Sequence, residues 1–513
     1  MLHRFCTALV VLLALACVSP EAWAQRRPPD FRVNTYTANN QFRPSVARLS
    51  DGGFVVTWMS ELQDVSSLYG VYGQRYSAAG VPVGGEFRVN TTTSSATHPS
   101  VAGLGRGGFV VTWATNVDNG SDEVYGRRYS AAGVPAGSEF RVNTHTANDQ
   151  YDPSVAGLSN GGFVVTWTSD GHQDGSHGGV YGQRYSAAGA PALGEFRVNL
   201  FTLRHQSRSS VAGLSNGDFV VTWTSDDQEP GLGGTTNEGV YARRYSASGA
   251  RIGGEFLVNT HTANIQRGSS VAGLGDGGFV VTWSSYDQDD PVTGNGQPRY
   301  YGVYGQHYSA LGARFGGEFL VNTHTANHQE YPSVASLDDG GFVVTWQSKV
   351  QDGSEYGVYG QRYSAAGARA GGEFRVNTYT ASLQKAPAVA GLSNGGFVVT
   401  WQSSGQDGSG GGVYGQRYGN FAPEITLDPV SQTVRSGQTV TFTANASGKP
   451  TPSVQWQLST NGGGIFTNIA SATAKTFTFS ATSRSNGNQY RAVFSNSLGT
   501  ATTKAATLTV GLF

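Results

Sequence analysis

The chain has 513 residues, with 34 Lys and Arg against 35 Asp and Glu and a formal net charge of -1. This balance gives no electrostatic reason to expect nucleic acid or an anionic membrane surface as a partner. Glycine accounts for 72 residues and only 13% of the chain is charged, which is typical of many short strands joined by tight turns. The composition therefore predicts an all-β protein of about two to four domains.

The N-terminus has the pattern of a secretory signal peptide over residues 1–24. A basic start is followed by an apolar run from Phe5 to Val18 and by an Ala-Trp-Ala cleavage signal at 22–24. We expect cleavage there and a secreted or cell-surface protein, with the periplasm as an alternative. Lipidation of Cys17 is a second alternative, although the sequence before it fits a lipobox poorly. Both cysteines, Cys6 and Cys17, lie in this segment, so the mature chain is predicted to have no disulfide.

One sequence unit then occurs seven times. Its Phe-Val-Val-Thr-Trp segment starts at residues 54, 109, 163, 219, 279, 342 and 397. In the third copy the pattern predicts strands at 154–158, 163–167, 180–185 and 195–199, with a hairpin turn of Asn and Gly, which tolerate positive φ, between the first two. The almost unbroken apolar character of the second strand suits a sheet covered on both faces. Four-stranded units in this number predict a seven-bladed β-propeller over residues 25–420.

The two ends of the repeat region predict a closed ring. A lone Phe-Arg-Val-Asn segment at 31–34 precedes the first unit, whereas the last unit stops at Tyr418 without its fourth strand. We expect the strand at 31–34 to complete the last blade. The terminal copies are as apolar as the central ones, which also disfavours an open solenoid with polar capping repeats.

The segments PSVA, GGFVVTW, QDGS, GVYGQRY and EFRVN follow one another at 153–199 and again at 332–377. This unit resembles repeats of bacterial secreted and adhesin-like proteins. The resemblance implies export and a propeller-like fold, and it brings no catalytic motif.

Residues 421–513 have a different rhythm of short alternating strands and resemble bacterial immunoglobulin-like domains. Trp456 matches the core tryptophan of the third strand, and Tyr490 matches the tyrosine corner. Ala444 and Ala492 stand where the family has its two cysteines. The resemblance implies a β-sandwich without its inter-sheet disulfide, acting as a spacer or a second contact.

Motifs that often carry chemistry have structural interpretations in this chain. Gly-x-Ser-x-Gly occurs at 157–161, 213–217 and 391–395, but these serines fall in predicted hairpin turns instead of the strand-to-helix turn of a nucleophile elbow. The repeat tryptophans could stack on sugars, yet each ends a central strand. Burial is the preferred interpretation, since it contributes roughly 4 to 6 kcal/mol of gross transfer energy per ring. We assign no catalytic residue and no bound cofactor from these motifs.

Two kinds of loop, between the second and third strands and between blades, are expected on one face of the ring. Long loops on a rigid scaffold are where binding residues usually lie. Aspartates recur there and could accept glycan hydroxyls or bind calcium, or they could cap turns by accepting backbone N–H groups. The candidate ligand-binding residues are Asp64, Asp174, Asp227, Asp289, Asp352 and Asp407; Asp289, and also Asp118, match the repeated position more loosely.

Three functions remain open. The leading hypothesis is a secreted or surface binding and adhesion protein whose propeller rim contacts a carbohydrate or a protein. The alternative is a glycosidase-like extracellular hydrolase in which acids such as Asp226, Asp227, Asp289 or Asp290 converge on a central pocket. The third is a purely structural repeat protein.

Overall fold

The computed structural model describes residues 30–511, except for 65–66, 106, 118–119, 172, 174, 176, 229–236, 290–299, 420, 450 and 497–498. The predicted signal peptide at 1–24, including Cys17, lies outside the described residues, and so do Asp118, Asp174 and Asp290. Within the described part, no helix combines the length and the apolar character needed to cross a membrane.

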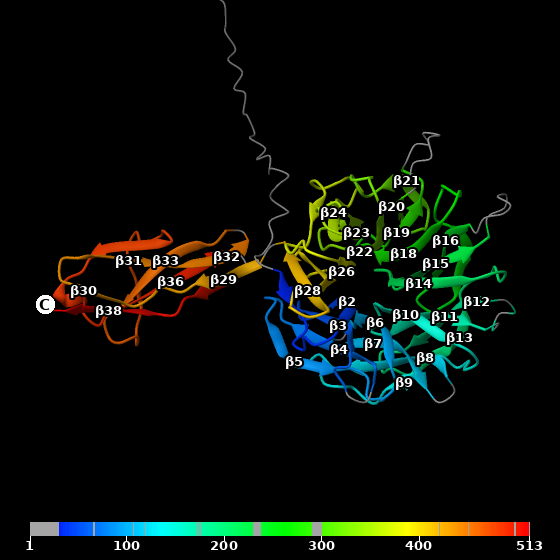
Figure 1. The fold of residues 1–513 in the computed structure, drawn as a ribbon, viewed down its shortest axis with the longest axis horizontal. Coiled ribbons are helices and arrows are strands. Elements are labelled where there is room, and N and C mark those ends of the chain that lie inside the picture. The colour runs from blue at the N-terminus through cyan, green and yellow to red at the C-terminus, as the bar shows by residue number, and fades with distance from the viewer. Residues whose placement is uncertain are drawn as a thin grey trace, which may run out of the picture.

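The described part of residues 30–419 forms seven four-stranded antiparallel sheets, arranged as blades around one axis (Figure 1). In every blade the first-named strand lies nearest the axis and the last-named strand lies outermost. Blade 1 has β2 (Gln41–Arg48), β3 (Phe54–Glu61), β4 (Tyr69–Tyr76) and β5 (Pro82–Arg88), and blade 2 has β6 (Ala96–Gly103), β7 (Phe109–Val117), β8 (Ser121–Tyr129) and β9 (Phe140–Arg141). Blade 3 has β10 (Gln150–Gly157), β11 (Phe163–Asp170), β12 (Gly178–Tyr185) and β13 (Pro191–Arg197), and blade 4 has β14 (Gln206–Gly213), β15 (Phe219–Asp226), β16 (Glu238–Tyr245) and β17 (Arg251–Leu257). Blade 5 has β18 (Gln266–Gly273), β19 (Phe279–Tyr286), β20 (Tyr301–Tyr308) and β21 (Arg314–Leu320), and blade 6 has β22 (Gln329–Ser336), β23 (Phe342–Lys349), β24 (Tyr356–Tyr363) and β25 (Phe374–Arg375). Blade 7 has β26 (Gln384–Gly391), β27 (Phe397–Ser404), β28 (Gly411–Tyr418) and β1 (Phe31–Arg32).

The ring is closed. Each innermost strand contacts the innermost strands of both neighbouring blades, and the series ends where β26 of blade 7 contacts β2 of blade 1. The predicted seven-bladed propeller is therefore confirmed. The strand boundaries differ from the prediction in one respect that matters for the site: the first strand of the third unit begins at Gln150, before the predicted start at 154.

The tryptophans of the repeat are core residues. All seven have no exposed surface, which confirms burial and leaves them no face for a sugar. At the start of each second strand, four residues before the tryptophan, aromatic rings join one blade to the next. Phe163 stacks on Tyr185 with ring centroids 4.6 Å apart, and Phe140 of the preceding blade lies 5.2 Å from the same Tyr185. Such pairs add about 0.5–1.5 kcal/mol to the transfer energy of their buried area.

Polar side chains at repeated positions connect the loops on the face opposite the tight turns. Asn199 is fully buried and its Oδ1 accepts the N–H of Val180 at 2.9 Å. Glu195 joins two loops: its Oε2 accepts the N–H of Thr144, in the loop between blades, at 2.6 Å, and its Oε1 accepts from Nε2 of Gln173 at 2.6 Å. The two kinds of loop are therefore in contact, as the sequence predicts.

The N-terminal segment completes blade 7 with the same contacts. Strand β1 pairs with β28, and beyond the strand the N–H of Val33 donates to the carbonyl of Val413 at 2.8 Å. Asn34 Oδ1 accepts the N–H of Val413 at 2.7 Å. Asp30 replaces the loop-joining glutamate, since its Oδ2 accepts the N–H of Thr378 at 2.7 Å. The predicted closure by residues 31–34 is confirmed.

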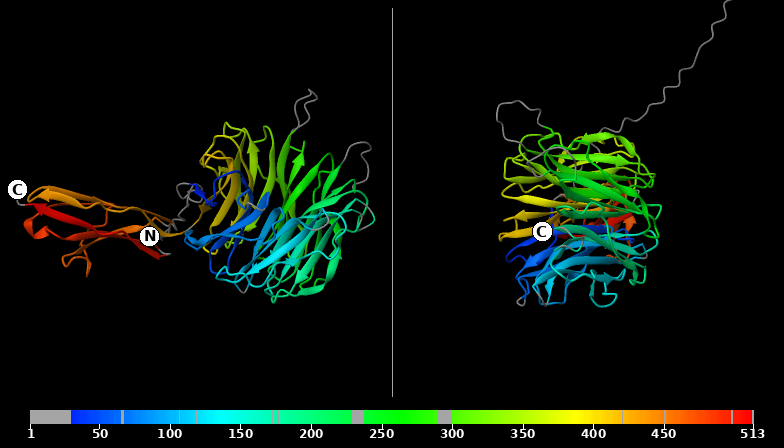
Figure 2. Two further views of the ribbon diagram at one scale, coloured as in Figure 1. Left: turned by 60° about the horizontal axis from the view of Figure 1, so that its bottom comes forward. Right: turned by 90° about the vertical axis from the view of Figure 1, so that its right-hand side faces the viewer.

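The C-terminal strands form an immunoglobulin-like sandwich that lies outside the ring of blades (Figure 2, left). Its strands are β29 (Phe421–Leu427), β30 (Gln432–Arg435), β31 (Thr439–Thr443), β32 (Asn445–Lys449), β33 (Ser453–Ser459), β34 (Thr467–Asn468), β35 (Thr476–Ser480), β36 (Gln489–Asn496), β37 (Gly499–Thr502) and β38 (Ala506–Gly511), with a 3₁₀ turn at Ser483–Ser485. Trp456 and Tyr490 are buried in one core cluster together with Ala444 and Ala492, the positions that the family gives to cysteine. Small apolar side chains thus fill the place of the disulfide.

Because β1 closes the ring, the same Asn→Ala substitution is expected to destabilise blade 7 more than blade 3. Asn34→Ala and Asn199→Ala each leave a buried N–H without its acceptor, at a cost of about 1–3 kcal/mol. In blade 3 the outer strand remains covalently joined to its own blade through the turn at 186–190, whereas in blade 7 the outer strand comes from the other end of the chain. We expect Asn34→Ala to lower the urea midpoint more and to increase amide exchange in β28. Equal midpoints for the two variants would mean that closure adds nothing to local packing.

Candidate functional site

Every innermost strand carries a β-bulge at the same position. In blade 3, Tyr151 pairs with Thr168 and Ser154 pairs with Thr166, so that Asp152 and the following proline together face Trp167. The other six innermost strands show the same shift of register. A bulge turns the side chain of the extra residue away from the ladder, which is one reason why bulges are common beside functional sites.

The first residue of each bulge has a left-handed backbone, with φ between 50° and 64°. These bulge residues are Arg43, His98, Asp152, Arg208, Gly268, Tyr331 and Ala386. Six of the seven are not glycine, and a left-handed residue with a side chain costs about 1–2 kcal/mol. The residues after the bulge are repeated, whereas this position carries two guanidinium groups, a carboxylate, an imidazole and a phenol, with glycine and alanine in the remaining two blades. Strain that is kept at a chemically diverse position points to function.

The neighbouring blade holds the bulge in place. The N–H of Arg208 donates to Oγ1 of Thr168 at 3.2 Å, and the N–H of Ala386 donates to Oε1 of Gln347 at 3.1 Å. Both acceptors directly follow the buried tryptophan of the preceding blade. The backbone of the bulge is therefore fixed by packed elements, while its side chain is free to vary.

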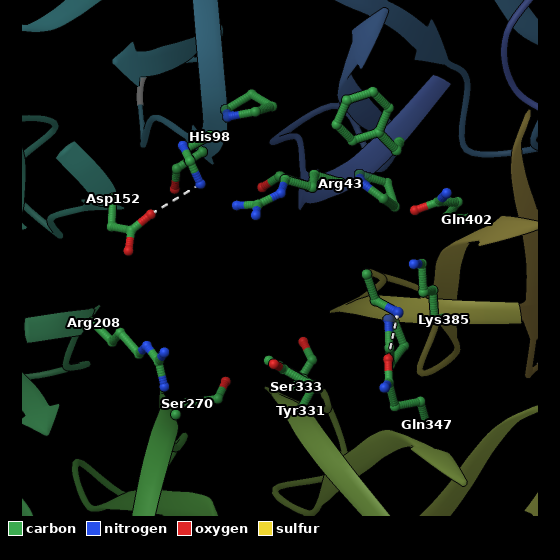
Figure 3. Close-up of a pocket in the computed structure, with 18 of the residues that line it drawn as sticks. Arg43, His98, Asp152, Arg208, Ser270, Tyr331, Ser333, Gln347, Lys385 and Gln402 are labelled. Carbon is green, nitrogen blue, oxygen red and sulfur yellow. Dashed lines mark hydrogen bonds and ion pairs between the residues drawn. The ribbon is translucent and has the colours of Figure 1, made fainter. Parts of the chain in front are cut away.

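The seven bulge residues line one cavity of about 1050 Å³ on the axis (Figure 3). Its wall also includes Glu61 and Tyr69, which flank the loop between the second and third strands of blade 1, so the cavity lies at the face that carries the loops. At the opposite ends of the innermost strands the backbones touch: a Cβ on Gly157 would lie 2.3 Å from the carbonyl oxygen of Gly103. The innermost strands thus approach one another closely at the turn face, and the cavity lies at the loop face.

An imidazole–carboxylate pair lies on one wall of the cavity. His98 Nε2 is 3.2 Å from Asp152 Oδ1, and His98 Nδ1 is 3.1 Å from Oγ1 of Thr97 (Figure 3). Burial lowers the pKa of His98, and Arg43 lowers it further, whereas Asp152 opposes the shift. The ring is therefore predominantly uncharged at neutral pH and can exchange a proton with a ligand.

The other carboxylates of the cavity are held by neighbours from their own blades. Oε1 of Glu330 accepts from the Tyr356 hydroxyl at 3.1 Å and from Nε2 of Gln347 at 3.2 Å. Burial raises the pKa of Tyr356, so the phenol stays protonated and donates. Glu61 Oε2 accepts from Nδ2 of Asn40 at 2.6 Å. The cavity therefore combines acids in fixed positions with several cations.

The rim aspartates that the structure describes come from different blades, and none of them lines the axial cavity. Asp64 forms an ion pair with Arg88. Asp352 accepts the N–H of Ser354 at 3.2 Å, and Asp407 accepts the N–H of Ser409 at 3.2 Å. Asp352 and Asp407 thus cap turns by accepting backbone N–H groups, whereas Asp64 is held by an ion pair.

The described acids at the start of the two long loops also lie outside the cavity. Asp227 accepts the N–H of Asn237 at 3.1 Å, and Asp289 lies 3.5 Å from Nδ2 of Asn322. The expectation that Asp226, Asp227 and Asp289 converge on a central pocket is wrong, because none of these three residues lines the axial cavity. Among the described residues, no three His, Cys, Asp or Glu side chains come together to hold a metal ion.

The sequence contains a pattern that could have identified the residues lining the cavity. Within the first strand of each unit, the residue before Pro-Ser-Val-Ala or its equivalent changes in charge and size while the following residues hardly change. A prediction based on variation in loop length, with the strand starting at residue 154, misses this position.

The immunoglobulin I-set domain family model matches residues 423–510. A curated relative, endoglucanase C of Cellulomonas fimi, is 45% identical over 89 residues, which are 17% of this chain and 8% of that protein. The chain thus spans less than a tenth of the length of this relative. The resemblance of the C-terminal domain is confirmed, and the resemblance of the repeats to adhesin-like proteins stays a prediction.

Solved structures are similar to about three quarters of the chain. A protein of unknown function from Dyadobacter fermentans has 11% identity and a TM-score of 0.46 over 77% of this chain and 98% of its own. An α-L-arabinofuranosidase of Fusarium graminearum has 9% identity and a TM-score of 0.44 over 76% of this chain and 97% of its own. At this identity the similarity concerns the fold alone.

The strain of the bulge can be measured with two opposite substitutions. A Cβ on Gly268 meets nothing within 4 Å, so Gly268→Ala tests the left-handed backbone without a steric clash. We expect this variant to lose about 1 kcal/mol of unfolding free energy, and Ala386→Gly to lose nothing or to gain up to about 1 kcal/mol. Urea unfolding measures both. Equal losses in the two variants would show that the bulge residues are not strained.

Proposed function

We propose that this chain is an exported carbohydrate-active protein that takes one end of a glycan into the axial cavity. The observation that carries the proposal is the ring of seven bulge residues, which differ in chemistry and share one left-handed conformation around a cavity of about 1050 Å³. Cavities of this size with a few convergent polar groups are typical ligand sites. The 89-residue similarity to a protein named endoglucanase supports a glycan as the ligand class.

The same observation argues against adhesion through the rim. Adhesion by equivalent rim sites would repeat one set of side chains in every blade, and the rim aspartates are repeated in this way. Those aspartates already cap turns or pair with a neighbour, as Asp352 and Asp64 do. The bulge position of the cavity, in contrast, carries six residue types in seven blades, with arginine twice, so the wall is asymmetric and can hold one ligand in one orientation.

Hydrolysis of the bound glycan is the activity that this cavity favours over simple recognition. Glycosidases usually employ two carboxyl groups on either side of the scissile bond. The wall of the cavity contains Glu61, Asp152 and Glu330, from three different blades. Asp152 shares the cavity with the uncharged imidazole of His98, a second group that can accept or donate a proton.

Matched isosteric substitutions separate the cavity from the rim. We expect Asp152→Asn to weaken binding of an active glycan at least about 10-fold, the equivalent of about 1.4 kcal/mol. Asp352→Asn, the same change at a rim position, should alter the affinity less than about 2-fold. Calorimetry with glycans selected from an array provides the affinities, and the thermal midpoint of each variant checks that it is folded. If only Asp352→Asn lost binding, the proposal of a glycan site in the cavity would be wrong, and adhesion through the rim would be the supported function.

Turnover is tested with the same glycans. If hydrolysis is the activity, the protein releases reducing ends, and Asp152→Asn or Glu330→Gln lowers kcat by about 10² to 10⁴. Tight binding without any release of reducing ends would overturn hydrolysis and leave glycan recognition as the function.

A further inference from the structure

The cations of the cavity differ from the other arginines of the propeller. Most arginines on the third strands donate to backbone carbonyls of the next blade: Arg75 reaches the carbonyl of Ala131 at 2.6 Å, and Arg244 reaches that of Ala310 at 2.7 Å. Such contacts satisfy the guanidinium within the fold. These residues are structural.

Arg43, Arg208 and Lys385 have no such partners. They come from blades 1, 4 and 7 and line the same cavity. Within the described part of the chain, none of their side chains donates a hydrogen bond or lies in an ion pair. Two of them, Arg43 and Arg208, also have left-handed backbones, with φ of 52° and 54°. Unpartnered cations at strained positions are not explained by packing.

Among the described residues, the acids that line the cavity form no ion pair with these cations, while Asp226 and Glu238, outside the lining, lie within electrostatic reach of Arg208. Asp152 faces His98, Glu330 accepts from Tyr356 and Gln347, and Glu61 accepts from an asparagine. Figure 3 shows Arg43 reaching toward the side of His98 and Asp152, with Lys385 and Arg208 on other parts of the wall and open space between them. Three donors of the described wall are therefore cations that no carboxylate of the wall pairs with directly.

We propose that the cavity selects an anionic glycan, a saccharide that carries carboxylate or sulfate groups, through Arg43, Arg208 and Lys385. This inference rests on the proposed function and names its substrate class. Guanidinium groups present paired N–H donors that match the oxygens of a carboxylate or a sulfate, and these charge-assisted bonds are stronger than bonds to hydroxyls. Three cations on separate blades also fix the direction in which the glycan enters.

Calorimetry on the full chain tests the substrate class with three oligosaccharide series of equal length. The probes are a neutral galactan, an oligogalacturonate and a sulfated galactan. We expect at least one anionic series to bind about 10-fold or more tightly than the neutral one, and its affinity to fall as salt rises from about 50 to about 300 mM, as expected for screened charges. Comparison of the two anionic series identifies carboxylate or sulfate as the recognised group.

Charge-removing substitutions localise the effect. We expect each of three substitutions to lower the affinity for the anionic probe about 10-fold and to change the affinity for the neutral probe less than about 2-fold. The substitutions are Arg43→Gln, Arg208→Gln and Lys385→Gln. Arg204→Gln is the matched control, because Arg204 is an exposed arginine that pairs with Asp227 at 3.5 Å, outside the cavity. It should leave both affinities unchanged.

The outcomes separate this inference from the proposed function. Equal binding of neutral and anionic probes, lost together in Asp152→Asn, would overturn the anionic substrate and keep the glycan site. Absence of binding by all three series would overturn both. Preference for the anionic probe that survives all three substitutions, or that falls in Arg204→Gln, would overturn the assignment to these cations.

Discussion

The pairing of β1 with β28 is the contact on which the rest of the propeller depends. Each blade buries both faces against its neighbours, so an unclosed end would expose one apolar sheet face and an unpaired edge. Closure also determines the site, because it places blades 1 and 7 side by side. Arg43 and Lys385, which are more than three hundred residues apart in the sequence, line one cavity for this reason.

Repeated and variable positions have separate physical roles. The repeated tryptophan, asparagine and glutamate fill the blade, cap its third strand and join its loops, and they leave few repeated polar groups free for a ligand. The bulge provides the exception. Its backbone is held by the preceding blade, as Thr168 holds Arg208, so that its side chain can be of any kind without changing the fold. Within one repeat unit, the repeated residues thus stabilise the fold, and the bulge residue is available to contact a ligand.

The sequence predicts the fold well because the fold is periodic. Seven Phe-Val-Val-Thr-Trp segments define the blades, and the unpaired segment at 31–34 defines the closure. The residues of the cavity are harder to predict from the repeat pattern. Asp152 precedes a proline and breaks the alternation of the strand, so the pattern places the strand start after it. The meeting of seven such residues on one axis follows only from three-dimensional closure.

A ring of near-identical blades would, by symmetry, present the same group seven times and could not distinguish one orientation of a ligand from another. The bulge residues remove that symmetry at one level of the axis only. The same position carries an imidazole in blade 2, a carboxylate in blade 3 and a guanidinium in blade 4, while the tryptophan beneath each bulge stays the same. A ligand that enters from the loop face therefore contacts different side chains in different blades, and these side chains are held by the same core residues in every blade. At the far end, the turn face, the innermost strands approach one another closely, as Gly157 approaches Gly103. A cavity that lies at the loop face suits the end of a chain better than a continuous strand threaded through it.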